Sequence, residues 1–98
     1  MDESVVREHA ERHGRAVVTG ELAVAVADLS EQVKPKASSV MKRLPSPLSA
    51  AEVTSVEPAA EGYAALIRYA GGDDAVVVVR STWAEVDGRP LIVELEIQ

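Results

Sequence analysis

The hydrophobic positions change period once along the chain, near Ser49. Before that point they recur every three or four residues, as expected of helices that bury one face. After it they form short runs rich in Val, Ile and Tyr, separated by turn residues, which is typical of strands. Helices followed by closely linked strands predict an α+β domain in which the helices cover one face of an antiparallel meander.

Three helices are expected within residues 2–44. The first covers about 2–19, with acidic residues at its start and Gly20 after its end, both of which suit the helix termini. The run 21–29 alternates as a strand would, but its many alanines favour a short helix. The third helix, about 35–44, begins with a proline and is ended by two more.

Four strands are expected within residues 51–97, at 52–57, 63–69, 75–86 and 90–97. The strongest turn between them is Asp87-Gly88, because a two-residue type I′ turn needs positive φ at both positions and these residues tolerate it. The sequence therefore predicts a curved antiparallel sheet of about four strands, closed by a hairpin.

A two-residue turn at Asp87-Gly88 determines which side chains share a face of that hairpin. It pairs Ala84 with Leu91 and Arg80 with Leu95. This face is the more apolar one and is expected to meet the helices. Tyr63, Ala65, Ile67 and Tyr69 join it if the turn near Gly71 contains two or four residues.

The opposite face then carries an apolar group among charged residues, and a helix would not cover it. A contiguous patch of this kind on a small protein marks an interface, and Trp is a frequent interface anchor. We therefore predict a homodimer packed sheet to sheet, with Trp83 near its centre. The predicted interface consists of Leu66, Val77, Val79, Trp83 and Ile92.

Composition supports one domain over residues 1–98, since a chain of this length cannot build two cores. Val and Ala account for 16 and 15 residues, against one Trp and no Phe. The core is thus lined with small side chains, and the monomer is expected to be only marginally stable. Oligomerisation is a common way for small domains to bury more surface.

The net charge of −6 lies in the sheet half, where residues 50–98 hold three basic and nine acidic groups. This balance argues against nucleic acid as a partner, because phosphate binding needs basic surface. The absence of Cys excludes disulfides and Cys-ligated zinc. No stretch predicts a membrane span, and no apolar run near Met1 resembles a signal peptide. The expected location is the cytoplasm.

The segment from Trp83 to Val93, WAEVDGRPLIV, together with the early run from Val5 to Leu22, resembles the nuclear-transport-factor-two-like, or SnoaL-like, superfamily. The resemblance implies a cystatin-like cone of helices and curved sheet. Members of that family include isomerases, cyclases, dehydratases and small proteins without known activity. Fold alone does not choose among these functions.

The candidate pocket residues are His9, His13, Tyr63, Tyr69 and Arg80, all expected on or facing the helix-covered side of the sheet. His9 and His13 share a helix face at the i, i+4 spacing, but no third ligand accompanies them, so no metal is predicted. Arg80 would need a partner if buried. It is expected either to pair with a helix carboxylate such as Glu8, Glu11 or Asp28, or to bind an anionic ligand.

The resulting functional hypothesis is a non-catalytic homodimeric SnoaL-like protein that binds a small molecule between helices and sheet, without a cofactor. The alternative is a small isomerase, cyclase or dehydratase that uses His13, Tyr63 and Arg80 in a shallow cone. A third reading is an accessory module whose outer sheet face binds another protein. A closed helix–sheet interface filled by Val and Ala favours the first hypothesis, whereas a pocket reached by His13, Tyr63 and Arg80 favours the second.

Overall fold

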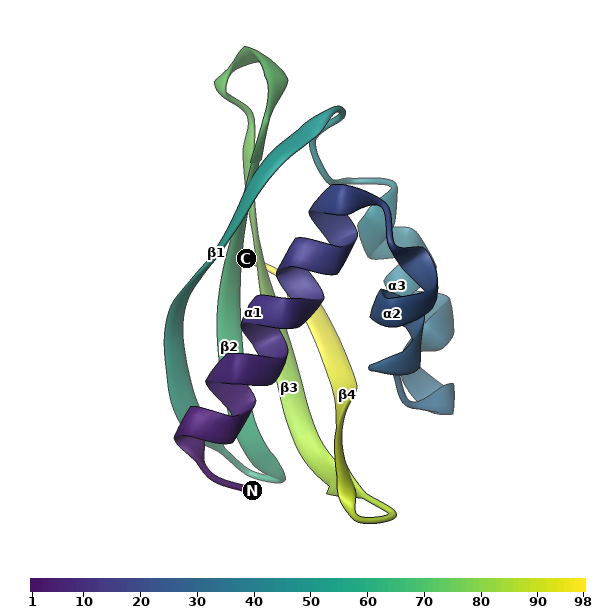
Figure 1. Cartoon of the computed structure of the whole chain (residues 1–98), viewed down its shortest axis with the longest axis vertical. Coiled ribbons are helices and arrows are strands. Elements are labelled where there is room, and N and C mark those ends of the chain that lie inside the picture. The colour runs from purple at the N-terminus through teal and green to yellow at the C-terminus, as the bar shows by residue number, and fades with distance from the viewer.

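Three helices cover one face of a four-stranded sheet in the computed structural model, which describes residues 1–98 (Figure 1). The helices are α1 (Glu3–Thr19), α2 (Leu22–Ala27) and α3 (Lys34–Met41). The strands are β1 (Leu48–Ala59), β2 (Gly62–Gly71), β3 (Val76–Val86) and β4 (Arg89–Ile97), antiparallel in the order β1-β2-β3-β4. The predicted α+β meander is confirmed, including the short helix within residues 21–29.

Helix α1 lies directly against the sheet. Asp2 caps its first turn, accepting a hydrogen bond from the Val5 backbone N–H at 3.0 Å, and this contact lowers the pKa of the Asp2 carboxyl. The buried face of α1 carries Val6, and Gly14 allows a close approach further along. A Cβ on Gly14 would lie 3.0 Å from the Cβ of Ala51 in β1, so a side chain there would push helix and strand apart.

The closing hairpin has the predicted two-residue turn. Asp87 and Gly88 have φ values of 50° and 81°, as a type I′ turn requires, and Ala84 pairs with Leu91 as expected. A β-bulge then shifts the register by one residue, with Val93 as the extra residue of β4. The predicted pairing of Arg80 with Leu95 is therefore wrong, because Arg80 pairs with Glu96.

The turn between β2 and β3 decides how their faces combine. Gly71 donates its backbone N–H to the carbonyl of Ala75 at 3.0 Å, so the loop between these two facing residues contains three residues, Gly72–Asp74, in place of two or four. As a result Tyr63 pairs with Trp83 and Tyr69 with Val77. Successive side chains of a strand point to opposite faces, so Trp83 shares the tyrosines' face and Arg80 does not.

The predicted faces of β3 are thus exchanged. Trp83 is fully buried beneath α1, and its ring centroid lies 6.0 Å from those of both His9 and His13. Arg80 lies on the outer face, where its guanidinium donates to Thr82 Oγ1 at 3.3 Å. Trp83 is thus fully buried while Arg80 is only half-buried, and burying the apolar ring more deeply than the guanidinium is the arrangement that solvation favours.

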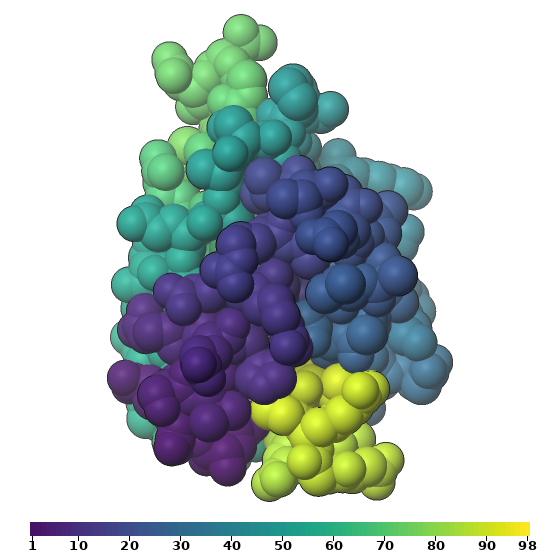
Figure 2. All heavy atoms as spheres, viewed as in Figure 1, coloured from purple at the N-terminus to yellow at the C-terminus, as the bar shows by residue number.

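Helices α2 and α3 cover the inner face beside α1, on the side of β4 (Figures 1 and 2). The segment that links them runs along the free edge of β4. Ile92 donates its backbone N–H to the carbonyl of Asp28 at 2.7 Å, and Ser30 donates to the Ile92 carbonyl at 3.0 Å. These two bonds hold Asp28 in a defined position at the polar end of the cavity described next.

Candidate functional site

An apolar cavity of about 300 Å³ lies between the three helices and the inner face of the sheet. Of its 15 lining residues, 12 are hydrophobic, so a bound molecule would meet few polar groups. The helices contribute His13, Val17, Leu22, Ala25, Val26, Lys34, Ala37, Ser38, Val40 and Met41; the sheet contributes Tyr69, Val79 and Leu95; Leu29 and Leu44 lie in the connections.

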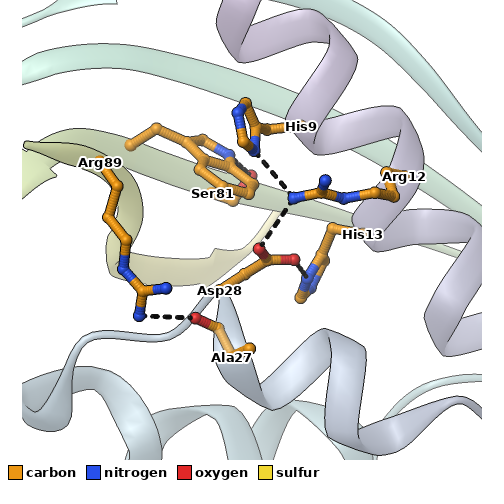
Figure 3. Close-up of polar contacts among 8 residues, drawn as sticks. His9, Arg12, His13, Ala27, Asp28, Ser81 and Arg89 are labelled. Carbon is orange, nitrogen blue, oxygen red and sulfur yellow. Dashed lines mark hydrogen bonds and ion pairs between the residues drawn. The ribbon is translucent and has the colours of Figure 1, made fainter.

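His13 provides a polar group in this cavity, and Asp28 holds its ring. His13 Nδ1 lies 2.9 Å from Asp28 Oδ2, and both residues are buried (Figure 3). A carboxylate can only accept hydrogen bonds, so Nδ1 carries the proton. In the neutral imidazole the lone pair is then on Nε2.

The Nε2 atom of His13 is free to bind a ligand. It has no hydrogen-bond partner in the protein. It also remains accessible to solvent, because Ser30 Oγ is the only fully buried side-chain polar atom that lacks a partner. His13 lines the cavity, and in the neutral ring Nε2 is the nitrogen left to accept a hydrogen bond. A His oriented by a carboxylate is also the arrangement of a general base.

Tyr69 provides a second polar group, from β2. Its side chain is buried and lines the cavity. Its hydroxyl has no protein partner and is not fully inaccessible. Burial raises the pKa of the Tyr69 hydroxyl far above its ordinary value, because desolvation disfavours the phenolate. The hydroxyl therefore keeps its proton and can donate a hydrogen bond into the cavity.

A polar cluster extends from Asp28 toward the surface (Figure 3). The Arg12 guanidinium lies 3.7 Å from Asp28 Oδ1 and donates to His9 Nδ1 at 3.1 Å. Both carboxylate oxygens thus face a cationic or hydrogen-bonding partner. On the other side of the histidines, Trp83 Nε1 donates to Ser81 Oγ at 3.0 Å, which satisfies the buried indole.

The structure brings only some of the predicted pocket residues together. His13 and Tyr69 line the cavity. His9 lies at the outer side of the polar cluster, and Tyr63 lies on the inner face opposite Trp83, and neither lines the cavity. Arg80 lies on the outer face, so its predicted inward position is wrong, as is a partnership with Asp28.

The predicted interface residues are redistributed in the same way. Val79, Trp83 and Ile92 are buried in the core, and Val77 is half-buried on the inner face. Their predicted position on an outer interface is wrong, because the three-residue turn after β2 places them under the helices. Only Leu66 lies on the outer face, where it pairs with Arg80.

Asp28 is the residue of the site that the sequence did not predict; it does not line the cavity but contacts His13, which does. Its partner His13 is 15 residues away, so no local spacing connects the two. The available indication was its position as the only charged residue in the apolar run 22–29, before the Ser30 turn. An isolated carboxylate in such a run is buried only when it has a partner.

No group of three or more His, Asp or Glu side chains is arranged to hold a metal ion. No helix is long and apolar enough to cross a membrane. Comparisons with protein-family models, curated proteins and solved structures find no match to this chain.

Proposed function

We propose that this protein binds a small, largely apolar molecule in the cavity between its helices and its sheet. The observation that carries the proposal is the cavity itself, with about 300 Å³ of space and 12 hydrophobic residues among the 15 that line it. Ligand pockets begin at about this size and combine apolar walls with a few placed polar groups. His13 and Tyr69 supply such groups.

His13 and Tyr69 are the two buried polar side chains among the lining residues, and they define the chemistry of the ligand. Of the other two polar lining residues, Lys34 is paired with Glu31 and Ser38 is exposed. With a neutral ring, His13 offers an acceptor at Nε2, and Tyr69 offers a donor. The best ligand has an apolar body with a hydroxyl or similar group that can donate to His13, and an acceptor for Tyr69. A hydrocarbon would leave both groups unpaired, which costs affinity once water is displaced.

Binding can be tested with an uncharged fluorescent probe, N-phenyl-1-naphthylamine. We expect saturable fluorescence enhancement, lost in an Ala37→Phe variant, because Ala37 lines the cavity and a phenyl group would fill it. An Ala60→Phe variant is the matched control, since Ala60 is exposed near the end of β1 and away from the cavity. Equal binding by both variants would contradict the proposal.

A second candidate function is catalysis of a proton transfer, favoured by the 2.9 Å His13–Asp28 contact beside the cavity. Nε2 would remove a proton from a bound carbonyl compound, Asp28 would stabilise the resulting imidazolium, and Tyr69 would donate to the developing oxyanion. This is isomerase, cyclase or dehydratase chemistry without Arg80 or Tyr63.

Deuterium exchange of the acidic C–H groups of 2-tetralone, followed by NMR, tests this candidate. We expect exchange above the buffer rate and a loss of roughly 10²–10⁴-fold of the catalysed rate in a His13→Gln variant. Exchange that proceeds equally in wild type, His13→Gln and buffer would leave the protein as a binder only. Retained probe binding in that variant would show that the cavity itself is intact.

Membership of the SnoaL-like superfamily belongs to the same proposal. It is supported by the order of elements, helices before a curved four-stranded antiparallel meander, and by the Asp87-Gly88 hairpin within the segment that carries the resemblance. A cytoplasmic location and homodimerisation stay predictions of the sequence, whereas the outer sheet face has lost four of the five side chains predicted for the interface.

A further inference from the structure

Helix α2 is apolar throughout and lies at the surface. Its six residues are LAVAVA, and only Ala25 is buried. Leu22, Val24 and Val26 are 52%, 41% and 47% exposed. We call Leu22, Ala23, Val24, Val26 and Ala27 the α2 ridge. Exposed apolar side chains that cluster on one element mark an interaction surface, whereas scattered ones are ordinary.

The apolar surface continues across the mouth of the cavity. Leu22 and Val26 of the ridge line the cavity and are exposed, and so is Met41 of α3, which also lines the cavity and is 42% exposed. Figure 2 shows the segment that contains α2, in blue, on the same face of the molecule as α1. A partner seated on the α2 ridge would therefore also cover the cavity.

Opposite charges flank the two ends of the ridge. Glu21 precedes the first residue of α2 and is exposed. At the other end, the exposed Arg89 side chain reaches to 3.5 Å from the carbonyl of Ala27. The helix is about 9 Å long at 1.5 Å per residue, so the two charges mark its opposite ends.

This charge arrangement is self-complementary. In a two-fold symmetric contact the same patch meets itself, with residue i of one copy on residue j of the other and the reverse. Two antiparallel α2 helices would place Glu21 of each copy near Arg89 of the other, twice per contact. The apolar ridges would pack between these pairs.

We propose that the α2 ridge is the interface of a homodimer of this chain. In this dimer each copy covers the cavity of the other. The sheet no longer supplies such a surface, because Trp83, Val79 and Ile92 are buried under the helices. Dimerisation does not depend on a ligand or on catalysis, so it can be tested separately from the proposed function.

Analytical ultracentrifugation tests the interface with a pair of matched variants. The wild type is expected to sediment at about twice the chain mass of 10.4 kDa, and Val26→Lys to weaken the dimer at least ten-fold. Val76→Lys is the control, since Val76 is 43% exposed at the start of β3, outside the ridge. A monomeric wild type at high concentration, or equal effects of both variants, would overturn the proposal.

Charge reversal tests the antiparallel orientation. Glu21→Arg and Arg89→Glu are each expected to weaken the dimer, because each places like charges opposite one another. The double variant E21R/R89E restores both pairs and is expected to recover most of the wild-type association. A double variant weaker than either single one would rule out this pairing.

Cross-linking separates this interface from one on the sheet, because the chain has no cysteine of its own. Val24→Cys, in the middle of the ridge, is expected to form a disulfide-linked dimer under mild oxidation. Leu66→Cys, on the outer sheet face, is expected to form little disulfide-linked dimer in the same experiment, because the two sheets do not meet. Faster cross-linking through Leu66→Cys would assign the interface to the sheet and overturn the α2 proposal. Circular dichroism verifies that each variant is folded.

Discussion

Asp28 organises the polar end of the cavity. Its backbone carbonyl is bonded to Ile92, and its carboxylate oxygens face His13 and Arg12. These contacts restrain the residue from two elements, since Ile92 lies in β4 and both His13 and Arg12 lie on α1. The side chain therefore orients the His13 ring through Nδ1 and leaves Nε2 without a protein partner.

Replacing Asp28 by Asn should show how much this pair contributes to stability. The buried His13 Nδ1–H loses a charged acceptor, so the free energy of unfolding is expected to fall by about 1–3 kcal/mol. Glu31→Gln is the control, because the exposed Glu31–Lys34 pair is worth less than about 1 kcal/mol. Urea titration measures the free energy of unfolding of both variants. Equal decreases would show that the His13–Asp28 hydrogen bond contributes no more to stability than the exposed pair.

Tyr69 should make the protein sensitive to alkali. Its pKa is raised in the folded state, so the unfolded chain releases the phenolic proton first as pH rises. The contribution of Tyr69 to the free energy of unfolding is therefore complete below about pH 10. Above that pH it declines, by up to about 1.4 kcal/mol per pH unit.

Comparing Tyr69→Phe with Tyr63→Phe isolates this effect, since Tyr63 is only half-buried. Urea titrations at pH 9 and 11 are expected to show a smaller alkaline loss in Tyr69→Phe than in wild type, and a nearly unchanged loss in Tyr63→Phe. An identical loss of stability between pH 9 and 11 in all three proteins would contradict a raised pKa at Tyr69.

Strand β3 is the element whose faces determine what the protein can do. Its inner face holds Trp83 and Val79 against the helices, and its outer face presents Arg80. The bulge at Val93 then keeps Leu95 on the inner face, opposite Ser81. The cavity floor therefore depends on one turn and one bulge.

The placement of Trp83 predicts the outcome of truncating it. Trp83→Ala should lower the free energy of unfolding by about 3–5 kcal/mol, because it removes a fully buried aromatic side chain. Leu66→Ala, on the outer face, should cost clearly less. Thermal unfolding compares them. A folded Trp83→Ala variant of unchanged stability that had lost only its self-association would instead support the outer position first expected.

At the scale of the whole molecule, a core built mainly from Val and Ala explains why a second copy would matter. Association at the α2 ridge would add buried apolar surface where the monomer exposes it, and each Å² contributes about 25 cal/mol. The two copies would also shield both cavities from water.

The dimer proposal predicts that the melting temperature rises with protein concentration, because association favours the folded state by mass action. Wild-type protein should show the rise by scanning calorimetry across a hundred-fold range of concentration. Val26→Lys should show little dependence over the same range. A melting temperature independent of concentration in the wild type would contradict dimerisation.

The sequence alone determined the element order and the Asp87-Gly88 turn. Both follow from short-range physics, namely the period of hydrophobic residues and the tolerance of Asp and Gly for positive φ. It also identified His13 and Tyr69 as candidate pocket residues, because each falls on the buried face of its own element.

Only the tertiary structure decided which face of β3 is buried and which carboxylate meets His13. The length of the Gly72–Asp74 turn and the bulge at Val93 each shift a register by one residue, and one residue exchanges the faces of a strand. Asp28 and His13 meet across 15 residues of chain because separate elements pack on one sheet. Such contacts depend on the burial of the whole core, which local patterns do not encode.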